Sequence, residues 1–371
     1  MRDKKKGGGL MKIVDALGKA EKKRAVAQTI VAATGLGLAS VIGMLTLYDS
    51  FFPRYERPDY EVTPGVRCYQ TMNDPPQREE LSFTSNDVEL KGYYYEASPS
   101  KGLVIVVHGF HSGADDYLPI IRYFVNNEYS VFAYDGRGVY DSGGDSTVGF
   151  CQSLVDLDNA LTFVEHSPVL GGYKRFLFGH SCGGYAVTSV LELHKGISAC
   201  AAIAPVNNCY TLILDKGKQY AGAFADSGLP KTFINAYQRI LFGKYSKCSG
   251  VRGINSVDIP VLIAHGTDDK IISFDGQSII SRQNEITNPN VRYYVGTGLL
   301  GGHDGIWHSE RSAEYRQKVA GDLKKLKDIK GGEFSVNELT DFYSEVDDEL
   351  YSEINYELMA DVLKTYDSAL K

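Results

Sequence analysis

One serine, in a tightly constrained local sequence, limits what this chain can fold into more than any other feature. Ser181 lies in the pattern Gly-x-Ser-x-Gly, between an apolar run at residues 175–178 and a helix-like run at residues 184–194. A serine on a sharp strand-to-helix turn projects its hydroxyl out of the fold, and flanking glycines allow that turn without steric clash. Because so short a pattern also arises by chance, its flanks decide what it means.

The flanks alternate between strand-like and helix-like segments. Residues 102–107 form a continuous apolar run, which is typical of a strand buried on both faces. Residues 88–95 alternate in polarity and predict an early antiparallel strand. Further strands are predicted at residues 130–134, 176–178, 198–204, 261–265 and 291–295, and helices at residues 115–126 and 154–166. This alternation predicts a mostly parallel sheet with helices on both faces.

Five ordered motifs carry a resemblance to a known family. They are His108-Gly109, Asp135-x-Arg137-Gly138, the turn at Ser181, His265-Gly266-x-x-Asp269 and Gly302-His303-Asp304-Gly305. Together they extend over roughly residues 80–325, and they resemble the α/β-hydrolase superfamily. The resemblance is to its bacterial serine-hydrolase branch, which includes monoacylglycerol-lipase-like and aminopeptidase-like enzymes. It implies an α/β-hydrolase fold with a lid insert at about residues 205–258.

The resemblance also implies a catalytic triad in the order Ser, Asp, His. Ser181 is the predicted nucleophile, and a neutral serine hydroxyl needs a base to take its proton and an acid to orient that base. The family pattern selects Asp269 as the acid over its neighbour Asp268. The glycine-rich loop before His303 favours that residue as the base over His308.

Backbone amides would stabilise the oxyanion of the tetrahedral intermediate. Carried over from the family, the two donors are Phe110, which follows His-Gly, and Cys182, which follows the nucleophile. His108 and His265 are interpreted as structural residues beside strand ends. No histidine cluster has metal-ligand spacing with a carboxylate partner, so neither a metal nor another cofactor is predicted.

The N-terminal region carries an independent signal. Residues 1–24 hold nine lysines and arginines against three acids, and residues 25–48 hold no charged residue. A helix of that length measures about 36 Å, enough to cross the apolar core of a bilayer. Because a basic flank stays in the cytoplasm, we expect a single-pass signal anchor in the plasma membrane with the catalytic domain extracytoplasmic. A cleaved signal peptide and a buried core helix are the alternatives.

The chain is therefore divided into five predicted regions. They are a basic cytoplasmic stub at 1–24, the transmembrane anchor at 25–48, a spacer at 49–80, the hydrolase domain at 81–327, and an acidic helical extension at 328–371. Cys209 and Cys248 bracket the predicted lid, and they could form a disulfide in an oxidising compartment.

The predicted function is a membrane-anchored serine hydrolase that cleaves a carboxylic ester. A serine peptidase or amidase with the same triad is the first alternative, and a catalytically silent binding or scaffold protein with this fold is the second. The expected partners are a small ester or peptide substrate and, through the N-terminal helix, a membrane. A net charge of −7 gives no reason to expect nucleic acid.

Overall fold

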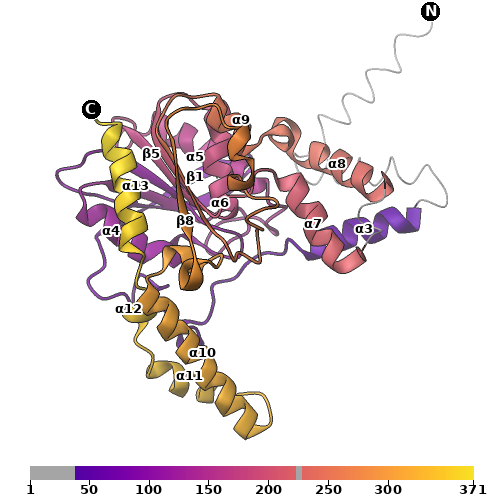
Figure 1. The fold of residues 1–371 in the computed structure, drawn as a ribbon, viewed down its shortest axis with the longest axis vertical. Coiled ribbons are helices and arrows are strands. Elements are labelled where there is room, and N and C mark those ends of the chain that lie inside the picture. Colours follow the sequence, from indigo (N-terminus) through magenta and orange to yellow (C-terminus); the bar gives the residue numbers. More distant parts are fainter. Residues whose placement is uncertain (1–37, 223–227) are drawn as a thin grey trace, which may run out of the picture.

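Eight strands form one continuous sheet at the centre of the computed structural model, which describes residues 38–222 and 228–371 (Figure 1). Their order across the sheet is β1-β2-β4-β3-β5-β6-β7-β8. Only β2 pairs antiparallel, with β1 and with β4, and the pairs from β4 to β8 are all parallel. The bounds are Arg78–Ser85 (β1), Val88–Tyr95 (β2), Leu103–Val107 (β3), Ser130–Tyr134 (β4), Arg175–His180 (β5), Ile197–Ile203 (β6), Val261–Gly266 (β7) and Val291–Gly296 (β8). The predicted mostly parallel sheet is confirmed.

Helices cover both faces of this sheet, because successive side chains of a strand point to opposite sides. In β3, Leu103, Ile105 and Val107 enter one apolar cluster, while Val104 and Val106 enter the other. α5, α6 and α9 contribute to the first cluster, and α4 and α13 to the second. Their bounds are Leu118–Asn126 (α4), Gln152–His166 (α5), Cys182–Ser189 (α6), Gly250–Asn255 (α9) and Tyr356–Ser368 (α13).

The insert between β6 and β7 holds two longer helices, α7 (Cys209–Ala221) and α8 (Gly228–Phe242). They lie beside the N-terminal helix α3 (Leu38–Ser50) on one side of the sheet (Figure 1). A third apolar cluster joins these helices; its buried members are Leu45, Tyr48, Phe52, Ile213 and Tyr237. The insert thus packs against the N-terminal segment.

The predicted membrane anchor at residues 25–48 lies mostly outside the described residues, and its described part belongs to α3. Leu45 and Tyr48 are buried against the insert, while the side chains of Ile42 and Leu47 are exposed. Within residues 38–222 and 228–371, no helix combines the length and the apolar character needed to cross a membrane. The last turn of the predicted span therefore contacts protein.

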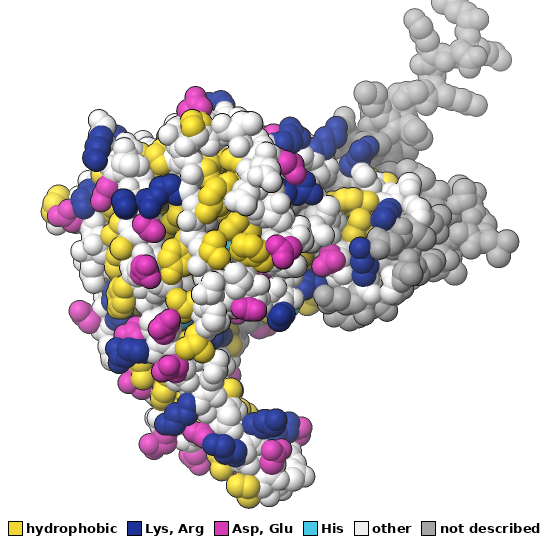
Figure 2. Space-filling view, viewed as in Figure 1, with side chains coloured by type: hydrophobic (Ala, Val, Ile, Leu, Met, Phe, Trp, Pro, Cys, Tyr) yellow, Lys and Arg dark blue, Asp and Glu magenta, His cyan; other side chains and the backbone are white. Residues whose placement is uncertain are grey.

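The end of the predicted C-terminal extension returns to the sheet. Four apolar residues of α13 are fully buried, and Tyr366 donates a hydrogen bond to the Leu177 carbonyl of β5 at 2.7 Å. In contrast, α10 (Glu310–Lys330) and α11 (Val336–Ser344) project from the body, and the short α12 (Asp348–Tyr351) follows them (Figure 1). Both basic and acidic side chains cover this projecting arm (Figure 2). The predicted boundary at residue 327 falls inside α10.

The cysteines are all free thiols in the structure. Cys209, at the start of α7, and Cys248, just before α9, are both buried and do not form the disulfide considered from the sequence. The insert is held to the body by apolar packing.

Candidate active site

Ser181 lies on a strained turn between β5 and α6. Its φ of 57° and ψ of −116° are a backbone conformation that a residue with a side chain rarely adopts. A Cβ added to Gly179 would lie 2.3 Å from the Gly183 carbonyl oxygen, and one added to Gly183 would lie 2.1 Å from that of Val107. Close backbone packing therefore requires both glycines of the motif. The Ser181 side chain makes no capping hydrogen bond to α6, so the helix does not use its hydroxyl.

The structure brings Ser181, Asp269 and His303 together. His303 Nε2 lies 2.9 Å from Ser181 Oγ, and His303 Nδ1 lies 2.7 Å from Asp269 Oδ2. The three residues follow β5, β7 and β8, and the carboxyl ends of these parallel strands meet at one edge of the sheet. Because a carboxylate can only accept, Nδ1–H donates to Asp269 and Nε2 accepts from the Ser181 hydroxyl.

Asp269 is held as a carboxylate by several donors. Its Oδ1 accepts hydrogen bonds from the amides of Ile271 and Ile272, both at 2.8 Å, and its Oδ2 lies 3.1 Å from His265 Nε2. Burial alone would raise the pKa of Asp269, but the hydrogen bonds from His265 and His303 outweigh burial and bring this pKa below its usual range. The Asp269 carboxylate, which accepts the hydrogen bond from His303, therefore stays charged at neutral pH.

The two alternative residues lie elsewhere. Asp268 accepts a hydrogen bond from the Thr267 hydroxyl, and its carboxylate packs against Gly301. His308 is buried, and its backbone pairs with Ile354. Burial lowers the pKa of His308 well below the usual histidine value. In the part of the chain that the structure describes, neither side chain hydrogen-bonds to Ser181.

The two predicted amide donors lie beside the nucleophile. Phe110 follows β3, and Cys182 begins α6 directly after Ser181. Burial raises the pKa of the Cys182 thiol to about 12. Cys182 is therefore a neutral thiol at physiological pH, and a neutral thiol is a weak nucleophile.

A buried chain of hydrogen bonds joins the three loops of the site. The Gly109 amide donates to the Tyr117 hydroxyl at 2.9 Å, and that hydroxyl donates to His180 Nδ1 at 2.9 Å. His180 Nε2 then donates to the His303 carbonyl at 3.3 Å. Burial and, secondarily, the nearby His303 lower the pKa of His180 to about 4. A neutral imidazole has one donor and one acceptor, which matches these two partners.

Sequence reasoning missed this connection. His180 lies directly before Ser181 in the Gly-x-Ser-x-Gly motif, but the motif does not identify its partners, and nothing in the local sequence marks Tyr117. The physical consequence is that the loop carrying Phe110, the nucleophile turn and the loop carrying His303 are held at fixed distances from one another.

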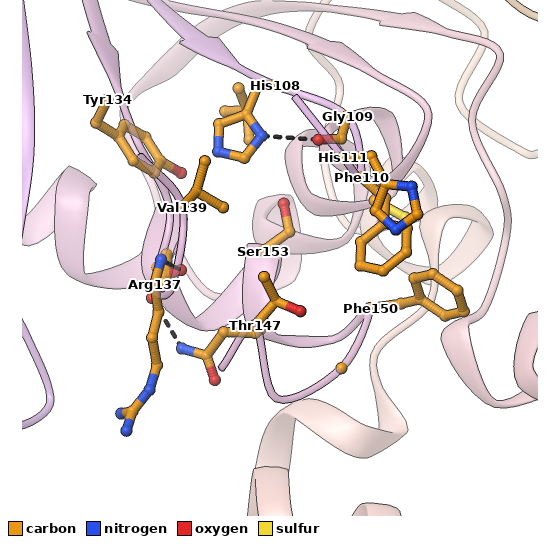
Figure 3. A pocket seen from close by; sticks show the side chains of 15 residues that line it. His108, Gly109, Phe110, His111, Tyr134, Arg137, Val139, Thr147, Phe150 and Ser153 are labelled. Atoms are coloured by element: carbon orange, nitrogen blue, oxygen red, sulfur yellow. Dashed lines mark hydrogen bonds between the residues drawn. The ribbon is translucent and has the colours of Figure 1, made fainter. Parts of the chain in front are cut away.

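A small cavity of about 40 Å³ lies beside the amide donors (Figure 3). Cys182 and Phe110 line it, and the rings of Phe110, His111 and Phe150 gather on one side. Arg137 lies on the opposite side in this view. The cavity is thus apolar and aromatic toward Phe150 and polar toward Arg137.

One cluster among the described residues has ligand-type atoms within 4.8 Å of one another, and it consists of His180, His303 and Asp304. Both ring nitrogens of His303 are already paired with Ser181 and Asp269. A metal ion at this point would compete with those contacts, so the cluster does not fit a metal site.

Comparison with known proteins identifies the fold. A family described as serine aminopeptidase S33 matches residues 98–239, which is less than half of the chain. An esterase from Pyrococcus furiosus superposes with a TM-score of 0.51 at 20% identity, covering 74% of this chain and 98% of the esterase. The chain has the α/β-hydrolase fold, as its motifs predicted, and is similar to serine hydrolases of the α/β-hydrolase superfamily.

Curated proteins with similar sequences carry names for several different activities. The uncharacterized protein YfhR from Salmonella typhi is 25% identical over 234 residues, covering 60% of this chain and 75% of that protein. The polyketide transferase grgF from a Penicillium species is 27% identical over 133 residues, covering 35% of this chain and 45% of the transferase. The non-heme chloroperoxidase of Streptomyces lividans is 25% identical over 256 residues, covering 58% of this chain and 92% of the chloroperoxidase. Because these names denote different reactions, the activity proposed for this chain is argued from the geometry of its candidate site.

Proposed function

We propose that this protein is a serine hydrolase that cleaves a carboxylic ester through an acyl-enzyme. Ser181 is the nucleophile, His303 the general base, and Asp269 the acid that orients the base. One observation carries the proposal: His303 lies between the Ser181 hydroxyl, at 2.9 Å, and the Asp269 carboxylate, at 2.7 Å. A hydroxyl in that contact can pass its proton to the imidazole while its oxygen attacks a carbonyl carbon.

The proposed reaction has two halves. Ser181 Oγ forms a bond to the ester carbonyl carbon, its proton moves to His303 Nε2, and the carbonyl electron pair moves onto oxygen. The amides of Phe110 and Cys182 donate to that oxygen, and each such donor is worth about 2.7–4 kcal/mol. When the intermediate collapses, the leaving alkoxide takes the proton from His303. Water then attacks the acyl-enzyme in the same way and restores Ser181.

A peptidase with the same triad is the second candidate, because one exposed carboxylate lies near the base. Asp304 follows His303 directly, its side chain is 63% exposed, and its Oδ1 lies 3.7 Å from His180 Nε2. A carboxylate there could hold the free amine of a peptide substrate. We favour an ester because the aromatic rings of Phe110 and Phe150 face the cavity beside the nucleophile.

Substrate preference separates the two candidates. We expect p-nitrophenyl esters to be hydrolysed with a kcat/KM at least about tenfold above that of aminoacyl p-nitroanilides, since the cavity favours an apolar acyl group. The opposite ranking would assign the site to peptides. A folded protein that hydrolyses neither substrate and does not react with a fluorophosphonate probe would instead be a binding or scaffold protein.

The insert α7–α8 is the proposed lid. Its residues Ile213 and Tyr237 share an apolar cluster with Phe52, and the Phe52 ring contacts that of Phe110 at 5.5 Å. Movement of these helices would therefore change access to the amide donors.

We also propose that residues 25–48 anchor the protein in the plasma membrane with the hydrolase domain outside the cytoplasm. The support is the charge-free stretch behind a basic segment, together with the exposed apolar residues Ile42 and Leu47 of α3. We expect protease added to spheroplasts to digest the domain and leave a cytoplasmic control protein intact. Recovery of the full-length protein in the soluble fraction would contradict the anchor.

A further inference from the structure

The segment before the hydrolase domain, most of it predicted as a spacer, packs against residues that line the cavity near Ser181. We call residues 48–57 the N-terminal strap. The ring of its Phe52 lies 5.5 Å from that of Phe110 and 4.9 Å from that of Phe150, and the latter two lie 4.9 Å apart. Phe110 and Phe150 line the cavity, while Phe52 stands behind them and is 3% exposed. The strap therefore supports the aromatic side of the cavity.

Backbone hydrogen bonds fasten the strap to the loop between β4 and α5. The Thr147 amide donates to the Phe52 carbonyl at 3.1 Å, the Tyr55 amide donates to the Gly138 carbonyl at 2.7 Å, and the Tyr140 amide donates to the Tyr55 carbonyl at 2.8 Å. This loop leads directly into Phe150. Its position and that of the strap are thus set together.

Two arginines reinforce the attachment. Arg54 donates to the Ser142 carbonyl at 2.8 Å, and Arg57 pairs with Asp115 at 3.0 Å and with Asp141 at 2.7 Å. The Asp115 side chain is almost fully buried. Loss of the Arg57 contact would leave the buried negative charge of Asp115 with fewer positively charged partners, which is unfavourable. These ion pairs therefore hold the strap in place strongly.

The N-terminal end of the strap, at Tyr48, packs against the insert. The Tyr48 hydroxyl accepts a hydrogen bond from Gln238 of α8 at 2.8 Å, and the Tyr48 ring contacts that of Tyr237 edge-on at 5.0 Å. A Cβ added to Gly149 would lie 2.3 Å from the Tyr48 hydroxyl oxygen. The residue before Phe150 therefore has to be glycine for the strap to pack this closely.

The position of the cavity indicates which part of a substrate it holds. Cys182 and Phe110 line it, and these residues carry the amides proposed to hold the carbonyl oxygen, whereas neither Ser181, next to Cys182 in the chain, nor His303 is among its lining residues. The leaving group has to lie near His303, since that ring protonates it. The cavity is thus on the acyl side of the reacting carbonyl.

We propose that the N-terminal strap forms the back wall of the acyl pocket and that Phe52 limits the length of the acyl chain. The inference rests on the proposed ester hydrolysis and adds the substrate class, which is esters of short, unbranched apolar acids. Three packed aromatic rings close the pocket at its apolar end, and a longer chain would have to displace the Phe110 and Phe150 rings that Phe52 supports.

The test is the acyl-length profile of wild type and Phe52→Ala, measured as kcat/KM for p-nitrophenyl butyrate and octanoate. We expect wild type to prefer butyrate, and Phe52→Ala to raise the octanoate-to-butyrate ratio by about tenfold or more, because space for added methylenes is worth that much. Phe150→Ala, at a partly buried ring that lines the cavity, should shift the ratio in the same direction. Phe52→Leu should restore most of the butyrate preference.

Phe124→Ala is the matched control, since Phe124 is fully buried and packs on Phe178 and Tyr366, and none of these three residues lines the cavity. It should lower stability without changing the ratio. An unchanged ratio in active Phe52→Ala and Phe150→Ala, or the same change in Phe124→Ala, would overturn the strap proposal. A wild-type protein inactive on every ester would instead overturn the proposed function.

Discussion

Replacing Ser181 with alanine is expected to lower kcat for ester hydrolysis on the order of a millionfold, as removal of a triad nucleophile does elsewhere. The reason is that no other nucleophile of residues 38–222 and 228–371 is placed to form the acyl-enzyme, since the adjacent Cys182 thiol is neutral with a pKa of about 12. The variant should fold, because the Ser181 side chain makes no capping hydrogen bond to α6. The measurement is steady-state hydrolysis of p-nitrophenyl butyrate with fluorophosphonate labelling in parallel.

Ser189→Ala provides the control for this experiment. Ser189 lies on the same helix, is fully buried, and its hydroxyl has no hydrogen-bond partner. Its loss should leave both activity and labelling near the wild-type level. Substantial turnover by purified Ser181→Ala, or labelling that persists in it, would remove Ser181 from the proposed mechanism.

Replacing Asp269 with asparagine should lower kcat on the order of ten thousandfold with a small effect on KM. An asparagine amide can donate to Nδ1, which places the imidazole proton on Nε2. That nitrogen then cannot accept the proton from Ser181, 2.9 Å away. Asp268→Asn is the matched control, because its carboxylate interacts with Thr267 and not with His303. A larger loss in Asp268→Asn would reassign the acid.

Wild type and Asp269→Asn also test whether the charge on Asp269 stabilises the fold. Its pKa in the folded protein lies below the unfolded value of about 3.9, so the ionised form stabilises the fold. That stabilisation is present above about pH 4 and is lost as the pH falls through the folded pKa. The difference in unfolding free energy between wild type and Asp269→Asn should therefore shrink as the pH falls below about 4. Chemical denaturation at several pH values measures it.

The sheet and the candidate triad were accessible from the sequence for a physical reason. A strand buried on both faces has to be apolar along its whole length, so residues 102–107 could be recognised locally. The strain at Ser181 needs glycines at fixed neighbouring positions, and the motif displays them. Because Asp269 and His303 follow parallel strands of the same sheet, their order in the chain already implied that they would meet at one edge.

Other features depend on contacts between segments far apart in the chain. Tyr117 and His180 are separated by 63 positions, and their hydrogen bond exists only once the turn before α4 packs against the end of β5. The packing of α13 on the sheet likewise depends on contacts between distant segments. Helical spacing predicts that α13 has an apolar face, but it does not identify the surface that this face contacts.

The amino-acid sequence by itself determined the α/β architecture and the three residues proposed for catalysis, because strand burial and a strained turn leave local patterns. Only the tertiary structure decided how the site is enclosed. Phe52 and Phe150 lie almost a hundred positions apart, and their contact follows from the complementary shapes of the strap, the β4–α5 loop and the insert. Apolar packing is not directional, so the composition of the spacer could not show which cavity it would close.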